Sequence, residues 1–293
     1  MKAGFLVPLA AAIALSACGA GGDGDGNGGA APDPANGAFG AVEPSVAGTK
    51  EAEAIDCSGL SRTAPEGRTD ILGVTIGMPA ETARRTLACA NPAYKVEYSA
   101  SGFVVPPMPD GTKPHGSISV DGGLDRIVAY LGGAPGKEQV IGITRSIEFA
   151  DGREPTIEQL NAQIAAKYGA LVPSPNSVGG MTAVYATSGE KLGPENEDLG
   201  RCSGGVNFVH GRIMNIYGGC GLTINYAVDP KSSNPQLVHK FLLTLVDQQL
   251  AMSLIEKATQ EVQGAHAAER QAEVERAKAD AKKAGGENRV PTL

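Results

Sequence analysis

The chain has 293 residues, with 25 Lys and Arg against 32 Asp and Glu and a net charge of −7. This acidic balance argues against a nucleic-acid-binding protein, which normally carries a basic surface. Aromatic residues make up 4% of the chain and Trp is absent, so we expect a core of Val, Ile, Leu and Ala. The sequence holds no Walker-type loop, no CxxC pair and no HExxH, and it therefore predicts no cofactor.

The N-terminus has the form of an export signal. Lys2 precedes an apolar run over residues 5–15, which has the length of a signal-peptide hydrophobic region and is too short to span a bilayer. The run ends in Leu15-Ser16-Ala17-Cys18, which resembles the lipobox of bacterial lipoproteins. The resemblance implies that residues 1–17 are a signal peptide and that Cys18 carries the lipid, with acyl chains such as palmitate as the membrane anchor. An ordinary secretory signal with an unrelated Cys is the alternative.

The residue after the Cys bears on the destination of such a lipoprotein. Gly19 is compatible with sorting to the outer membrane, whereas Asp at this position often retains lipoproteins elsewhere. We therefore expect an outer-membrane lipoprotein of the bacterial cell envelope, facing the periplasm or the cell surface.

Residues 18–56 are rich in Gly, Pro and Asp and predict a flexible tether behind the lipid. The segment 23–28, Asp-Gly-Asp-Gly-Asn-Gly, begins like a calcium-binding loop. Such a loop needs a Glu at its twelfth position, which is Pro34 here. We expect a solvated linker and no calcium site.

Residues 57–235 predict an α+β domain. We expect strands over residues 71–76, 95–98, 117–120, 126–131, 140–149, 182–186, 206–209, 213–217 and 222–228, and helices over 79–89 and 157–168. Thr156 and Gln159 have the spacing of a capping box. Short adjacent strands favour an antiparallel sheet, with the two short helices packed on one face.

Within the strand over 140–149, the alternation places Ile141, Ile143 and Ile147 on one face. Arg145 falls on the same apolar face, so its charge must pair or reach solvent.

The stretch from Ile76 through Gly77, Met78 and Pro79 to Leu87 resembles the opening of envelope lipoproteins of the SmpA/OmlA type. In those small α+β domains a Gly-Met-Thr/Ser turn starts a helix and strands follow. The match covers about a dozen residues, and Pro79 stands where a hydroxyl residue is usual. A common strand-turn-helix junction is the alternative explanation.

Four cysteines remain besides Cys18, and an even number in an exported chain predicts two disulfides. A hairpin centred on Gly211 would place Cys202 opposite Cys220, within disulfide range. This pairing leaves Cys57 to pair with Cys89.

Cys202 also lies in Gly200-Arg201-Cys202-Ser203-Gly204, a thiol version of the G-x-C-x-G nucleophile elbow. That interpretation makes Cys202 the nucleophile of an envelope hydrolase, with His210 or His239 as its base. It requires a strand before the Cys and a helix after it, whereas the sequence predicts a strand after it. The disulfide is the favoured interpretation.

Other polar groups show no metal or acid–base pattern. The four histidines are widely separated and lack the spacing of metal ligands; they are His115, His210, His239 and His266. The carboxylates of 195–198 lie in a predicted loop bounded by Gly and Pro, where we expect them to be solvated. No metal site and no catalytic residue is predicted.

Residues 236–284 predict one long helix, and residues 285–293 a disordered tail. Up to Val262 the helix carries an apolar i, i+4 ridge that we expect to dock on its own domain. Beyond Val262 it consists of Ala, Glu, Lys and Arg, and its apolar stripe is too thin to predict a coiled coil.

The sequence therefore predicts a non-enzymatic lipoprotein, anchored through Cys18, that acts as a binding or scaffold module in the envelope. Its charged helix would contact envelope proteins or the cell wall. The alternatives are the Cys202 hydrolase and a small-ligand-binding lipoprotein with its site on the open face of the sheet.

Overall fold

A computed structural model describes residues 56–58, 60, 69–99, 105–176, 179–204 and 216–285, and every structural statement below concerns these residues. Several predictions lie outside them: the signal peptide, Cys18, the tether, His210, the strand over 206–209, most of the strand over 213–217, and the tail beyond Gly285.

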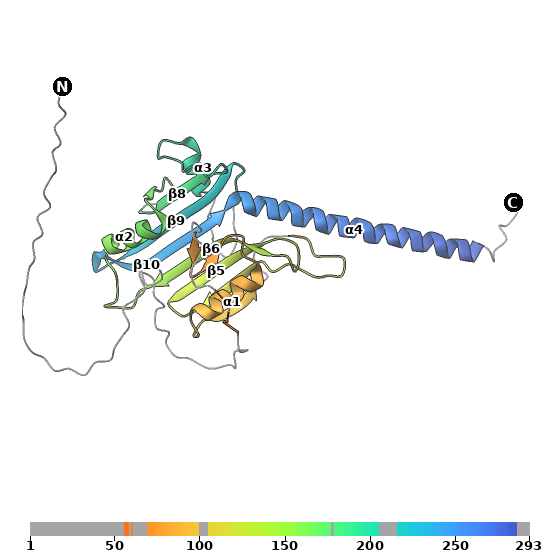
Figure 1. Ribbon diagram of the computed structural model, residues 1–293, viewed down its shortest axis with the longest axis horizontal. Helices are drawn as coiled ribbons and strands as arrows, with labels where there is room; N and C mark the ends of the chain where they lie inside the picture. Colours follow the sequence, from red (N-terminus) through yellow and green to blue (C-terminus); the bar gives the residue numbers. More distant parts are fainter. Residues whose placement is uncertain are drawn as a thin grey trace, which may run out of the picture. The chain divides into compact units, whose positions relative to one another are not determined.

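The described part is α+β, as predicted (Figure 1). Its elements are β1 (Asp70–Ile71), β2 (Val74–Thr75), α1 (Ala80–Ala90), β3 (Lys95–Ser99), β4 (Ser117–Asp121), β5 (Asp125–Gly132), β6 (Gln139–Glu148), α2 (Ile157–Tyr168), β7 (Val172–Pro173), β8 (Met181–Ala186), α3 (Glu197–Gly204), β9 (Cys220–Lys231), β10 (Asn234–Asp247) and α4 (Gln248–Gly285).

One sheet of eight antiparallel strands dominates the fold, in the order β3-β4-β5-β6-β10-β9-β8-β7. The order divides into two meanders of four strands, each preceded in the chain by a helix: α1 before β3–β6 and α2 before β7–β10. The last strands of the two meanders, β6 and β10, pair at the centre of the sheet.

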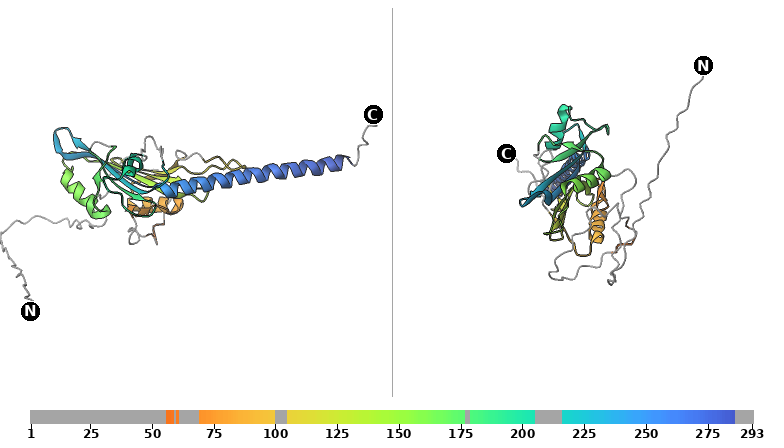
Figure 2. Two further views of the ribbon diagram at one scale, coloured as in Figure 1. Left: turned by 90° about the horizontal axis from the view of Figure 1, so that it is seen from above. Right: turned by 90° about the vertical axis from the view of Figure 1, so that its left-hand side faces the viewer.

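Helices α1 and α2 share one face of the sheet, which we call the inner face (Figure 2, left). Leu87 of α1 and Leu160 and Ile164 of α2 are at most 1% exposed and belong to the same core cluster as the strand residues beneath them. The β1–β2 hairpin adds Ile71 and Val74 to this cluster. The predicted capping box begins α2, with Thr156 Oγ1 accepting from Gln159 N at 3.1 Å and the Gln159 side chain accepting from Thr156 N at 3.0 Å.

The prediction that Ile141 shares a face with Ile143 is wrong, because a β-bulge lies between them. Tyr130 pairs with Gly142 but Leu131 pairs with Val140, so Ile141 is the additional residue in β6. The alternation shifts by one residue at this point. Ile143 therefore lies in the inner core, while Ile141 contacts Tyr130 on the opposite, outer face.

The prediction of a helix over 236–284 and of a domain boundary at residue 235 is wrong for its first twelve residues. Residues 236–247 belong to β10, which lies between β6 and β9 in the middle of the sheet. Residues 243–246 are buried on both faces of the sheet, and the run from Phe241 to Val246 is apolar except for Thr244, so it satisfies a helical i, i+4 ridge as easily as a strand. The helix begins at Gln248, where the Asp247 carboxylate accepts a hydrogen bond from Leu250 N at 2.8 Å.

Helix α4 begins on the outer face and then leaves the sheet (Figures 1 and 2). Ala251 packs with Tyr130 and Ile141 on the outer face, and Ala258 and Val262 pack with Val105 of the segment before β4. His266 Nε2 lies 3.0 Å from Pro107 O, and the side chains of residues 267–284 that follow are exposed. No helix in the described part is both long enough and apolar enough to cross a membrane.

Candidate functional site

Both predicted disulfides are present. Cys57 is bonded to Cys89 near the end of α1, with their Cα atoms 5.7 Å apart, and Cys202 is bonded to Cys220 with a Cα separation of 5.6 Å. The chain therefore carries a disulfide in each half of the domain, as expected of a protein that folds in an oxidising compartment.

The route to the Cys202–Cys220 pair differs from the predicted hairpin. Cys202 lies in α3, a helix that the sequence analysis missed, and Cys220 is the first residue of β9. Gly200 and Gly204 weaken the helical signal of this segment. The G-x-C-x-G stretch is thus inside a helix rather than at a strand-to-helix turn, and the Cys202 sulfur is bonded and 1% exposed.

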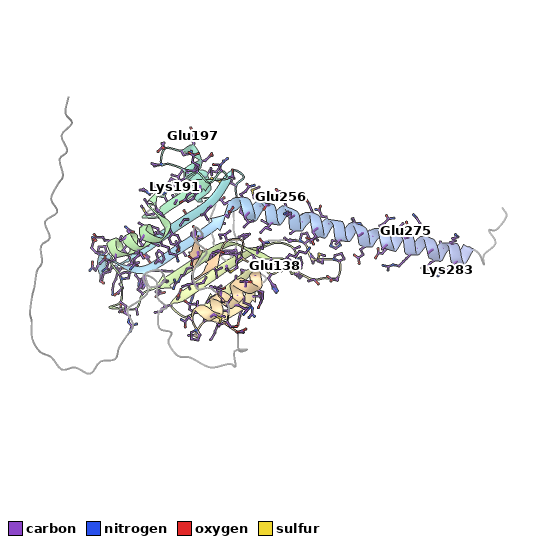
Figure 3. All side chains as sticks on the ribbon, in the orientation of Figure 1. Glu138, Lys191, Glu197, Glu256, Glu275 and Lys283 are labelled. Atoms are coloured by element: carbon purple, nitrogen blue, oxygen red, sulfur yellow. A yellow bond between two sulfur atoms is a disulfide. The ribbon has the colours of Figure 1, made fainter. Side chains whose placement is uncertain are left out.

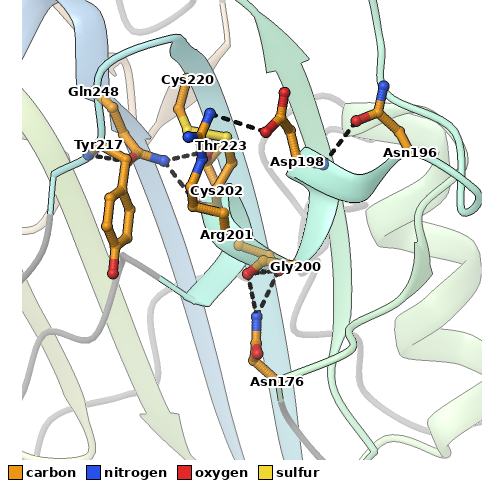
Figure 4. Close-up of a disulfide and its surroundings, with 11 residues drawn as sticks. Asn176, Asn196, Asp198, Gly200, Arg201, Cys202, Tyr217, Cys220, Thr223 and Gln248 are labelled. Carbon is orange, nitrogen blue, oxygen red and sulfur yellow. Dashed lines mark hydrogen bonds and ion pairs between the residues drawn. A yellow bond between two sulfur atoms is a disulfide. The ribbon is translucent and has the colours of Figure 1, made fainter.

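Gln248, the first residue of α4, joins this disulfide to the long helix (Figure 4). Its Nε2 donates to Cys202 O at 2.8 Å and to Thr223 Oγ1 at 2.9 Å, and its Oε1 accepts from Tyr217 N at 3.1 Å. The Gln248 side chain is fully buried, so these bonds satisfy all of its amide groups in a site closed to water. The start of α4 is therefore fixed to the α3 disulfide and to β9.

On the same side of the molecule, Asn176 holds α3 in place. Its Nδ2 donates to Gly200 O at 2.5 Å and to Ser203 Oγ at 3.0 Å (Figure 4). No local sequence pattern predicted the roles of Asn176 and Gln248, because the partners of their side chains are more than 20 residues away in the chain.

Arg145, which the sequence placed on an apolar face where it had to pair or reach solvent, is paired. Its guanidinium donates to the Asp125 carboxylate at 3.0 and 2.7 Å, and Tyr94 Oη donates to the same carboxylate at 2.5 Å. Burial alone would lower the pKa of Arg145, but the hydrogen bonds and charge of Asp125 hold it above its ordinary value. The two charged side chains are 3% and 0% exposed, so this cluster is enclosed in the inner core and offers no surface to a substrate.

The described histidines occupy separate places. His115 stacks on Tyr98 with ring centroids 4.1 Å apart, His239 lies 3.8 Å from Glu148, and His266 contacts the segment before β4. Partial burial and a hydrogen bond to Glu81 raise the pKa of Tyr98 to about 12, so its hydroxyl stays protonated near neutral pH. Among the described residues, no three His, Cys, Asp or Glu side chains form a group able to hold a metal ion.

The acidic segment 195–198 is partly helical rather than a loop. Glu197 and Asp198 form the first turn of α3, where negative charge is favoured by the helix dipole. Asp198 pairs with the exposed Arg201 at 2.9 Å.

The outer face of the sheet carries polar side chains in the area that α3 and α4 do not cover. Arg126, Ser146, Leu242 and Ala227 lie in register across β5, β6, β10 and β9, and Leu242 is 40% exposed. The next row toward α4 holds Thr144 and Thr244, whose hydroxyl oxygens are 3.4 Å apart. This is the open sheet surface that the sequence predicted as a small-ligand site, and these two rows offer hydroxyl groups and the guanidinium of Arg126.

The second accessible surface is the distal half of α4, residues 267–284, where every side chain is exposed (Figure 3). Glu275 bonds Lys278 at 3.0 Å and Gln271 at 3.0 Å within this helix. These side chains stabilise the helix locally and leave its apolar residues uncovered.

Comparison with known proteins adds no assignment: no family model, no curated protein and no solved structure matches the chain. The SmpA/OmlA resemblance of the stretch from Ile76 to Leu87 stays a prediction.

Proposed function

We propose that this protein is a bacterial envelope lipoprotein, anchored in the outer membrane through Cys18, that acts as a non-enzymatic binding or scaffold module. The observation that carries the proposal is the lipobox Leu15-Ser16-Ala17-Cys18 behind a signal-like apolar run. Acyl chains on Cys18 would hold the domain on the membrane, since each buried CH₂ contributes about 0.8 kcal/mol.

Two features of the domain support this proposal. The disulfides Cys57–Cys89 and Cys202–Cys220 fit an exported protein, because the cytosol keeps thiols reduced. The distal half of α4 extends past the domain with all of its side chains exposed, which fits a helix that meets a partner.

The anchor is tested by the intact mass of the natively processed protein, measured with and without reductant and alkylation. The proposal requires cleavage before Cys18, added acyl chains and no free thiol. A Cys18→Ser variant is the matched control and should remain unprocessed and unacylated. An unmodified thiol at position 18 in the wild-type protein would refute the anchor.

The binding role of α4 is tested separately, by recovery of partners from envelope extract. A variant that ends at His266 keeps the packing of Ala258 and Val262 and the contact of His266 with Pro107, and it removes the distal half. We expect this variant to lose partners that the full chain recovers. Equal recovery by both forms would remove the distal half of α4 from the proposed function.

A further inference from the structure

The distal half of α4 presents a seam of small apolar residues on one side. In heptad terms, Ala267, Val274 and Ala281 occupy a positions, and Ala277 and Ala284 occupy d positions, so their spacing keeps them on one side of the helix. Arg270 takes the remaining d position, where its aliphatic stem adds apolar cover and its charge reaches solvent. All of these side chains are exposed.

The seam is flanked by opposite charges. Glu273 and Asp280 lie on one flank, at g positions, and Lys278 lies on the other, at an e position. In a parallel pair of helices, a g residue faces the e residue of the next heptad in the partner. Two copies in parallel would therefore place Glu273 against Lys278 of the second copy, twice. An antiparallel pair would place like flanks together, with acidic g residues against acidic g residues.

The seam also lies on the side of α4 that is free of the domain. Ala251 and Ala258, which pack on the domain, are spaced by seven residues. The same spacing continues to Ala272 and Ala279, which are f positions on the side away from the seam. A second helix at the seam would therefore approach from the side opposite to the packed domain.

We infer that the distal half of α4 pairs in parallel with the same segment of a second copy of this chain. The stripe is thin, and the charged flanks set the orientation and register. Ala at the seam lets the two backbones come close, so the contact is made by packing over a short length. The inference deepens the proposed function by naming a partner for α4, but it does not depend on the lipid. Two copies anchored at their N-termini in one membrane would also have a high local concentration.

Disulfide trapping in the full chain tests the pairing, with Cys18→Ser in every variant so that no other thiol is expected to be free. Ala281→Cys puts a thiol at an a position of the seam, and Ala279→Cys puts an equally exposed thiol on the far side. We expect Ala281→Cys to form covalent dimers about tenfold faster than Ala279→Cys, because thiols at a positions of a parallel pair face each other. Equal rates would overturn the inference.

The orientation is tested by mixing Ala267→Cys and Ala281→Cys chains of distinguishable mass. Parallel pairing predicts dimers joined between identical positions. Predominant linkage of position 267 to position 281 would overturn the parallel arrangement.

Charge exchange provides a second readout, by sedimentation equilibrium. Glu273→Lys or Lys278→Glu alone gives the facing positions 273 and 278 the same charge, and each should weaken self-association about tenfold because two ion pairs become repulsions. An equimolar mixture of the two variants should restore it. Arg276→Glu, at the outward c position, is the matched control and should associate like the wild type. A wild-type chain that stays monomeric at every concentration, or single variants that associate as well as it does, would refute the pairing whether or not Cys18 is acylated.

Discussion

The buried pair of Asp125 and Arg145 allows a quantitative test of how the inner core is held. Asp125→Asn preserves the size of the side chain but removes the charge opposite Arg145, whose side chain is 3% exposed. A buried charge that loses its partner costs about 3–5 kcal/mol of unfolding free energy. At about 2–4 °C per kcal/mol for a domain of this size, the melting temperature should fall by about 6–20 °C.

The assay is urea unfolding followed by circular dichroism, with thermal melts in parallel. Arg145→Met should cost a similar amount, because the buried carboxylate keeps its hydrogen bond from Tyr94 but loses its countercharge. The double variant should lose at least about 1 kcal/mol less than the sum of the single losses, since the two residues act on each other directly. The control is Arg126→Met, at an exposed position of β5 next to Asp125. It should change the free energy of unfolding by no more than about 0.5 kcal/mol.

Additive losses in this cycle would contradict the account, as would an Asp125→Asn variant as stable as Arg126→Met. Either result would mean that water or another group neutralises the guanidinium and that the hydrogen bonds of 3.0 and 2.7 Å contribute little.

Three further predictions follow from single contacts. A hydrogen bond from Lys231 lowers the pKa of Glu154 from its ordinary 4.5 to about 2. The ionised Glu154 should therefore make the protein more stable than the Glu154→Gln variant above pH 4.5, and this difference in stability should fade as the pH falls toward 2. Thermal melts of both proteins across this pH range measure it. Thr156→Ala removes one half of the α2 capping box and should cost about 1 kcal/mol in urea unfolding. Gln248→Ala leaves the buried carbonyl of Cys202 without its donor and should cost about 1–3 kcal/mol, with faster hydrogen exchange in the first turn of α4.

Local signals predicted much of this fold. The Thr156–Gln159 capping box placed the start of α2, because its two hydrogen bonds are made within four residues of chain. The even number of cysteines outside the lipobox predicted two disulfides, and both proposed pairs form. The pairing was right although the hairpin used to reach it was not, since α3 brings Cys202 to β9 in place of a strand.

The failures occur where tertiary packing decides between local alternatives. Residues 236–247 are apolar enough for a buried helix or a central strand, and only pairing with both β6 and β9 selects the strand. The face of Ile141 depends on a bulge beside Gly142, a residue type that often accompanies bulges but does not by itself fix where the alternation shifts. The same limit applies to the candidate sites: the sequence indicated that Arg145 must pair or reach solvent, but only the pairing of β5 with β6 places Asp125 beside it.

The two halves of helix α4 are stabilised in different ways, and the difference bears on the proposed pairing of its distal half. Residues up to Val262 are held by burial against the domain and by Gln248, so they supply the nucleus from which a helix propagates. The distal half buries nothing in its own domain and is stabilised by Ala and by pairs such as Lys278 with Glu275. Because the first turn is the costly step in helix formation, attachment to a docked first half keeps the charged flanks and the seam in a defined helical register. The distal half adds nothing to the core of the domain. A partner that binds its exposed seam in one register, such as a second copy, would stabilise it as a helix.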